Sequence, residues 1–337
     1  MTTKRIVECV PNFSEGRDMS VIRQITDAIE SVAGICLLNV DPGDATNRTV
    51  VTFVGEPEAV VEAAFRGAKR AAEVIDMRKH HGTHPRQGAT DVLPLIPVSG
   101  ITLEECAILA RQLAERMARE AGIPCYAYEA AALRPDHRNL ADCRAGEYEA
   151  LEKKLADADF MPPLTHPSSF TTHPQKCGIS VVGARDFLIA INWNLNTTDT
   201  SIAKAIAADV REKGRPDRPD MLPSTKAIGW YIEEYGIAQV SMNMTNFHVT
   251  PLHLAYEGVC HSAERHGVHV TGTEIIGLVP KQALTDAGRY FLEKQHLPTD
   301  IPEEDIIKMA VKTMNLDDLC PFDPRKKVIE YLMEETE

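Results

Sequence analysis

Histidine and cationic side chains are concentrated in one ten-residue segment, residues 77–86. These side chains are Arg78, Lys79, His80, His81, His84 and Arg86. Imidazole gains and loses protons near neutral pH. Guanidinium and ammonium groups bind carboxylates and phosphates. The segment therefore predicts a site that binds a multiply charged anion and moves a proton on it.

Two other interpretations of this segment remain open. His80 and His84 are four residues apart, so on a helix they would share one face and could bind a metal ion. However, Gly82 and Pro85 disfavour a helix here, and no acidic ligand follows at a recognisable spacing. Alternatively, the segment is a polar loop whose cations lie near the carbonyls that end a helix. That interpretation explains the cations but not three histidines.

The composition limits the class of protein. The chain has 337 residues, of which 44% are hydrophobic and 25% charged, as expected for a globular protein of one large or two medium domains. Its net charge of −13 argues against binding to nucleic acid or anionic membranes. No run approaches the roughly 18 apolar residues of a membrane span. The eight cysteines form no Cys-x-x-Cys pair, which indicates reduced thiols in a cytoplasmic protein.

Hydrophobic periodicity predicts strands and helices in the order β-α-β-β-α-β, the ferredoxin-like arrangement. The predicted elements are strands 5–10, 35–41, 49–55 and 91–98, with helices 18–31 and 56–75. A further helix (102–121) and a strand near 125–128 extend this unit. Two tail helices are expected at 303–314 and 324–335.

The second half of the chain repeats the first at an offset of 181 residues. The run Asp18–Ile25 resembles Asp199–Ile206, and Leu95–Val98 resembles Ile276–Val279. Shared register over several elements favours an internal duplication. The proline-rich segment 157–177 is the expected joint. We therefore predict an α+β protein with two tandem ferredoxin-like subdomains, residues 1–178 and 179–337, and a ligand groove between them.

Several runs of residues resemble one family. They are Glu8–Gly16, Asn47–Val50, Thr52–Gly55, Ile75–Arg86, Arg144–Leu151, Gly183–Leu188 and Ala227–Tyr231. These runs are similar to glutamate formiminotransferase, and the resemblance extends from the first strand to the last helix. In animals this domain is fused to a cyclodeaminase, so the chain resembles the monofunctional form.

The resemblance implies a transferase of one-carbon groups. Such an enzyme moves the formimino group of N-formimino-L-glutamate to N5 of the co-substrate tetrahydrofolate and releases L-glutamate, in histidine degradation. No metal ion is implied. The expected partners are these small molecules and a second copy of the chain, with no nucleic acid and no membrane.

The resemblance also implies roles for individual residues. His84 falls on the family's catalytic histidine, and Asp41 is the candidate carboxylate that orients it. An alternative is that Asp41 only begins the turn at Pro42 and Gly43. The candidate substrate-binding residues are Arg48, Lys79, His80, His81 and Arg86. The candidate folate-binding residues are His166, Pro167, Ser168, Ser169, Phe170, Thr171 and Gly178.

Three rival functions remain open on the sequence. The same histidine chemistry would serve formyl transfer between 5-formyltetrahydrofolate and glutamate. A folate-binding protein without catalysis would keep folate affinity when His84 is replaced. A metal-dependent hydrolase would contain stoichiometric metal and lose activity with a chelator.

Overall fold

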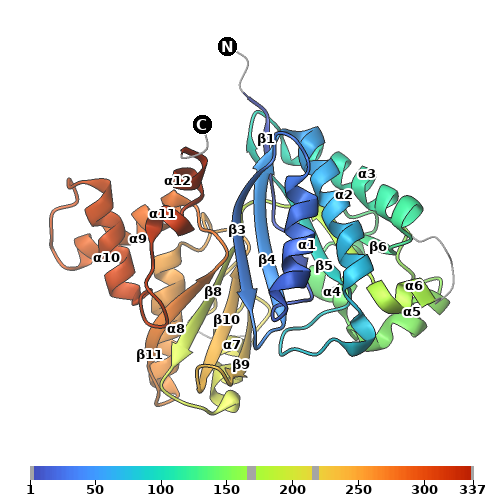
Figure 1. Cartoon of the computed structure of the whole chain (residues 1–337). Coiled ribbons are helices and arrows are strands. Elements are labelled where there is room, and N and C mark those ends of the chain that lie inside the picture. The colour runs from blue at the N-terminus through green and yellow to red at the C-terminus, as the bar shows by residue number, and fades with distance from the viewer. Residues whose placement is uncertain (1–3, 165–171, 215–219, 335–337) are drawn as a thin grey trace. The chain divides into compact units, whose positions relative to one another are not determined.

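The computed structural model of the chain describes residues 4–164, 172–214 and 220–334. It divides into two compact units, Met1–Asp186 and Phe187–Glu337. In Figure 1 the first unit runs from blue to green and the second from yellow to red. Two sheets and several helices make the protein α+β, as predicted.

The first unit is built on a 7-stranded sheet in which β2 continues the line of β1 and β3 pairs with β4 at one edge. Its strands are β1 (Ile6–Cys9), β2 (Asn12–Phe13), β3 (Cys36–Gly43), β4 (Arg48–Gly55), β5 (Thr90–Ser99), β6 (Cys125–Glu129) and β7 (Ser180–Ala184). β1 pairs antiparallel with both β4 and β5. β7 lies parallel between β5 and β6.

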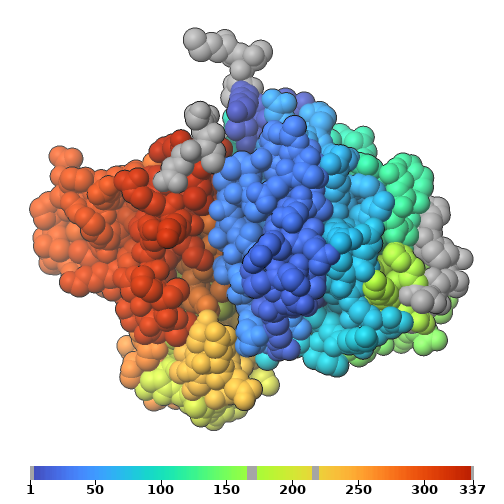
Figure 2. Space-filling view, viewed as in Figure 1, coloured from blue at the N-terminus to red at the C-terminus, as the bar shows by residue number. Residues whose placement is uncertain are grey.

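Long amphipathic helices pack on one face of this sheet, as Figure 1 shows. They are α1 (Met19–Glu30), α2 (Pro57–Val74) and α3 (Leu103–Ala121). In the space-filling view of Figure 2, side chains of α1 and α2 cover part of the sheet. Strand alternation divides the side chains between the faces, because neighbouring residues point in opposite directions. Along β7, for example, Val182 enters this core while Val181 faces a smaller cluster.

Short helices follow β6, and some of them contribute side chains to that smaller cluster. They are η2 (Pro135–His137), α4 (Leu140–Arg144), η3 (Tyr148–Ala150) and α5 (Leu151–Ala156), followed later by α6 (Thr172–Cys177). Cys143, Leu151 and Leu155 pack there against Tyr126 and Tyr128 of β6. None of these helices is expected from the sequence, because each is too short to show a helical period.

The second unit is built on a four-stranded antiparallel sheet with the order β11-β8-β10-β9. Its elements are β8 (Ile189–Leu195), α7 (Thr200–Val210), β9 (Thr225–Ile232), β10 (Ile237–Met244), α8 (Leu252–Arg265), β11 (Val270–Ile276), α9 (Lys281–Lys294), α10 (Glu303–Met314), α11 (Pro324–Lys327) and α12 (Ile329–Glu334). The buried Trp193 of β8 lies in its core. None of the described helices of either unit is long and apolar enough to cross a membrane.

The two units share an order of elements and a strand order. In the first unit β5, β1, β4 and β3 occupy the places that β11, β8, β10 and β9 occupy in the second. The matching helices even begin alike. Oδ1 of Asp18 accepts the Ser20 N–H at 2.8 Å at the start of α1, and Oδ1 of Asp199 accepts the Ser201 N–H at 2.7 Å at the start of α7. These caps are 181 residues apart, the offset found in the sequence.

Two features of the fold differ from the sequence predictions. The units divide after Asp186, whereas the sequence placed the boundary at 178/179, because β7 completes the first sheet between β5 and β6. The tail helix expected over 324–335 is interrupted at Val328. The extended backbone there forms a bridge with Val279, which a continuous helix could not make.

Gly178 allows a close backbone approach next to β7. Its φ is +71°, and a Cβ built there would lie 2.1 Å from the Gln87 carbonyl oxygen. We expect Gly178→Ala to lower the free energy of unfolding by about 2–5 kcal/mol, since left-handed strain and overpacking add. Gly236 is the matched control, because its φ is +66° with no atom within 4 Å. Urea denaturation checks this expectation, and equal losses in Gly178→Ala and Gly236→Ala would contradict it.

Candidate functional site

The histidine segment is an irregular loop between α2 and β5. It begins with the 3-10 turn η1 (Met77–Lys79), which the Asp76 side chain caps by accepting the Arg78 N–H at 3.2 Å. Backbone at His80 is extended, with φ −80° and ψ 130°. His80 and His84 therefore do not share a helical face. Among the described residues, no group of three or more His, Cys, Asp or Glu side chains is placed to hold a metal ion.

Asn47, in the turn between β3 and β4, fixes this loop. Its Nδ2 donates to the His81 carbonyl at 3.0 Å, and its Oδ1 accepts the Gly16 N–H at 3.0 Å. Its own carbonyl lies 2.7 Å from His80 Nε2. Asn47 has φ 48°, a left-handed conformation that asparagine tolerates better than most residues. One buried side chain thus joins the turn, the loop and the segment that follows β2.

Gly82 lets the loop lie directly on that turn. A Cβ at Gly82 would be 2.1 Å from the Thr46 carbonyl oxygen. Next to it, the Thr83 N–H donates to the Ala45 carbonyl at 3.1 Å. Close backbone packing therefore requires a glycine at position 82. The same packing fixes the position of the chain just before His84.

His80 has a structural position. It is buried, and because a carbonyl oxygen only accepts hydrogen bonds, its Nε2 must donate to Asn47. Burial lowers the pKa of His80, so the ring stays neutral. Its predicted contact with substrate stays a prediction.

His84 is half-buried and has a defined tautomer. Its Nδ1 donates to the Pro85 carbonyl at 2.7 Å, so Nε2 carries the lone pair in the neutral ring. Burial lowers the pKa of His84 well below its usual value, and the charges of Arg48 and Arg144 lower it further. The charge of Asp91 opposes this effect. The neutral imidazole is therefore the resting form and can accept a proton at Nε2. The predicted partnership with Asp41, which pairs with Val50 in the sheet, stays a prediction.

The charges that act on His84 belong to a buried network at one end of the first sheet. Oδ2 of Asp91 accepts from Arg48 Nη1 and from Arg144 Nη2, both at 2.7 Å. Arg48 Nε also donates to Oδ1 of Asn12 at 3.1 Å. Burial alone would raise the pKa of Asp91, but the charges of Arg144 and Arg48 outweigh it and lower the pKa to about 2. Asp91 is therefore a carboxylate at every physiological pH.

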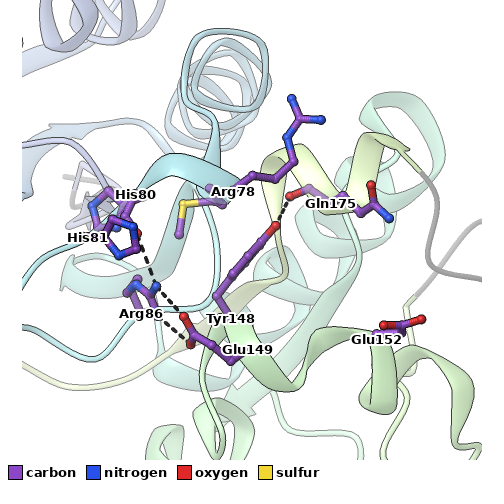
Figure 3. A pocket seen from close by; sticks show the side chains of 9 residues that line it. Arg78, His80, His81, Arg86, Tyr148, Glu149, Glu152 and Gln175 are labelled. Carbon is purple, nitrogen blue, oxygen red and sulfur yellow. Dashed lines mark hydrogen bonds and ion pairs between the residues drawn. The ribbon is translucent and has the colours of Figure 1, made fainter.

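A pocket lies beside the first part of the loop (Figure 3). It is a cavity of about 270 Å³ whose lining includes Arg78, His80, His81, Arg86, Tyr148 and Gln175. His84 is not among its lining residues. The candidate residues therefore divide into two places, with His81 and Arg86 at the pocket and His84 and Arg48 at the buried network.

Arg86 is engaged by acidic side chains at this pocket. Its guanidinium forms two hydrogen bonds of 2.8 Å with the Glu149 carboxylate, as drawn in Figure 3, and a third of 3.3 Å with Glu147. The Tyr148 N–H donates to the Arg86 carbonyl at 3.0 Å. These contacts bring the Arg144–Leu151 run against the histidine loop. Arg86 thus holds the site together, and its binding of substrate stays a prediction.

The other candidate residues are distributed as follows. Lys79 is exposed, and Gly178 makes the close backbone contact given above. The folate candidates His166, Pro167, Ser168, Ser169, Phe170 and Thr171 lie outside the described residues. Sequence reasoning missed Asn47, Asp91 and Arg144 as site residues. Asn47 and Arg144 begin two of the runs quoted above, whereas Asp91 opens an apolar strand and carried no signal.

Comparison with known proteins identifies relatives along the whole chain. Residues 6–185 match the formiminotransferase domain, N-terminal subdomain, and residues 190–334 match the formiminotransferase domain. A formimidoyltransferase-cyclodeaminase from Gallus gallus is 48% identical over 98% of this chain, which spans only 60% of that relative. A glutamate formimidoyltransferase from Streptococcus pyogenes is 44% identical over 86% of this chain and 94% of its own length. A solved microcompartment protein from Desulfitobacterium hafniense has a TM-score of only 0.22.

Replacing Asn47 tests its role in holding the loop. We expect Asn47→Ala to lower the free energy of unfolding by about 2 kcal/mol or more, since it leaves the Gly16 N–H and the His81 carbonyl without their partner. Asn315 shares φ 48° but is exposed, and its Nδ2 donates to the Thr271 carbonyl at 2.7 Å, so Asn315→Ala is the control for backbone strain together with one exposed hydrogen bond. Chemical denaturation of both variants measures the difference. A loss in Asn47→Ala no larger than in Asn315→Ala would show that the side-chain hydrogen bonds of Asn47 do not stabilise the fold.

Proposed function

This chain belongs to the formiminotransferase family of one-carbon transferases, and we propose that it transfers the formimino group of N-formimino-L-glutamate to N5 of tetrahydrofolate. The products are 5-formiminotetrahydrofolate and L-glutamate. The observation that carries the proposal is His84, whose Nδ1 is hydrogen-bonded to a carbonyl and whose Nε2 carries the lone pair of a neutral ring beside a buried cationic network. The relatives' names support the donor and the group transferred.

The proposed reaction needs one proton to move twice. N5 of the folate attacks the formimino carbon and forms a C–N bond, while His84 Nε2 takes the proton that N5 loses. The tetrahedral intermediate then breaks its bond to the glutamate nitrogen, and His84 returns the proton to that nitrogen. A neutral imidazole is the form needed for the first step, and the lowered pKa makes its protonated form a strong acid for the second.

Holding the two substrates together supplies the other part of the rate. Among the candidate residues, Arg48 is proposed to bind a carboxylate near His84, while the side chains of Lys79 and His81 are exposed. We assign the segment 166–171 and Gly178 to folate. The family resemblance supports that assignment.

The topology of the two units is also part of the proposal. We propose that both units are ferredoxin-like, on the strength of their shared β-α-β-β-α-β order and strand order. The place in histidine degradation, the homodimer and the cytoplasmic location stay predictions from the sequence.

Turnover of N-formimino-L-glutamate with tetrahydrofolate tests the function. We expect the wild type to be active and His84→Ala to fall by about 10²–10⁴-fold in kcat, because a positioned acid–base group contributes that much. His261, an exposed histidine of α8, provides the control variant His261→Ala, which should keep wild-type activity.

Each other result of that assay has a distinct meaning. A wild type that uses only N-formyl-L-glutamate would be a formyltransferase. Tight folate binding without turnover in the wild type would indicate a binding protein. Equal activity of wild type and His84→Ala would remove the histidine from the mechanism.

The lowered pKa of His84 predicts a pH dependence. A base works in its neutral form, which is lost only when the pH falls below its pKa. Because that pKa lies well below about 6.5, kcat/KM should hold at pH 6.5 and decline only in more acidic solution. The imidazole proton signal that is missing in His84→Gln belongs to His84. In proton NMR of the free protein, the pH titration of that signal should have the same low midpoint. A midpoint at or above about 6.5 would contradict the assignment.

A further inference from the structure

The Asp91 network holds more positive charge than its carboxylate can balance. Two guanidinium groups, from Arg48 and Arg144, share the single oxygen Oδ2, and the other oxygen accepts the Gln87 N–H at 2.8 Å. The side chains of Arg48 and Arg144 are 8% and 12% exposed, and that of Asp91 is fully buried. One carboxylate neutralises one guanidinium, so this network has a buried positive charge in excess. Excess charge removed from water is costly unless an anion joins it.

A third cation lies next to this network. Lys154 of α5 is buried, and its Nζ donates to the Gln87 side-chain oxygen at 3.2 Å and to the Cys143 carbonyl at 2.7 Å. Burial lowers the pKa of Lys154 to about 8, so it remains mostly protonated at neutral pH. Both of its acceptors are uncharged. Lys154 therefore adds to the excess instead of balancing it.

Two hydrogen-bond donors of the same network are buried without a partner among the described residues. They are Nε of Arg144 and Nε2 of Gln87. Buried donors are normally satisfied, so each such group needs an explanation. Excess positive charge and unused N–H donors are the two properties that a carboxylate site requires.

We propose that Arg144, together with Arg48, binds the α-carboxylate of the amino-acid substrate beside His84, and that Asp91 positions both guanidinium groups. The inference rests on the proposed function for the identity of the substrate. The α-carboxylate is the one chosen because it shares a carbon atom with the nitrogen that must receive the proton from His84. The carbon of the side-chain carboxylate is about three bonds from that shared atom, whereas the carbon of the α-carboxylate is bonded to it directly.

Binding of this carboxylate would also change the proton affinity of His84. The groups that act on His84 are Arg48 of β4, Arg144 of α4, Asp91 of β5 and the Pro85 carbonyl. A bound anion balances the two guanidinium charges that disfavour the imidazolium. The His84 ring should therefore hold its proton more firmly when substrate is present, which suits a group that must take a proton during the reaction.

Calorimetric binding to the full chain tests the site with three probes: L-glutamate, its α-amide and its γ-amide. We expect the wild type to bind the α-amide about 10- to 100-fold more weakly than L-glutamate, the range for hydrogen bonds to a charged group. Arg144→Gln should lose this preference, and Arg144→Lys should keep part of it. Arg138→Gln is the matched control, since Arg138 is exposed in the same segment and should retain the wild-type pattern.

The possible outcomes separate this site from the proposed function. The site is wrong if Arg144→Gln distinguishes the probes as the wild type does, if only the γ-amide is discriminated, or if L-glutamate does not bind. If the α-carboxylate preference depends on Arg144 but the wild type does not turn over formiminoglutamate, the site stands and the function fails. A merely structural role of Arg144 would weaken all three probes equally. In the wild type, L-glutamate should also raise the NMR titration midpoint of His84.

Discussion

The burial of the Asp91 carboxylate organises the first unit. A charged group that has left water needs charged and polar partners, and Asp91 obtains them from three directions. Arg48 reaches it from β4, Arg144 from α4, and the Gln87 N–H from the segment that precedes β5. Elements far apart in the sequence are therefore held at one end of the sheet by a single carboxylate. Their chemistry follows from that arrangement, because the same charges set the proton affinity of His84.

The three histidines of the loop perform different tasks although they are close in sequence. His80 is buried and bonded to the backbone of Asn47, His81 is exposed at a pocket, and His84 lies beside the arginines. Backbone contacts at Gly82 and Asn47 impose this separation, since they bend the chain between the first two histidines and the third. Three histidines that are close in sequence thus occupy three different environments: a buried support, an exposed surface and a position beside buried charges.

Much of this structure could be predicted from residues that repeat at regular spacing. Long helices and alternating strands were located within a few residues, and the 181-residue offset indicated two similar halves. The histidine loop was singled out because cations and imidazoles rarely occur so close together, and Arg48 was named through the family resemblance; the roles of these residues stay predictions. Asp91 and Arg144 were not found, because they matter through an ion pair with each other and are 53 residues apart in the sequence. β7 was missed for a related reason, as a strand of five residues does not reveal which strands it will lie between.

The place of β7 also has a consequence for how the protein emerges from the ribosome. β6 is made more than fifty residues before β7, yet within the described sheet its ladder partner is β7 alone. Until Ser180–Ala184 has left the exit tunnel, β6 cannot be tied to β5, and the backbone groups with which β6 pairs to β7 must remain with water or a chaperone. Closure of the first sheet thus waits for almost the last residues of its own unit. Vectorial synthesis delays assembly of the part of the molecule that carries Arg144 until the second unit is about to begin.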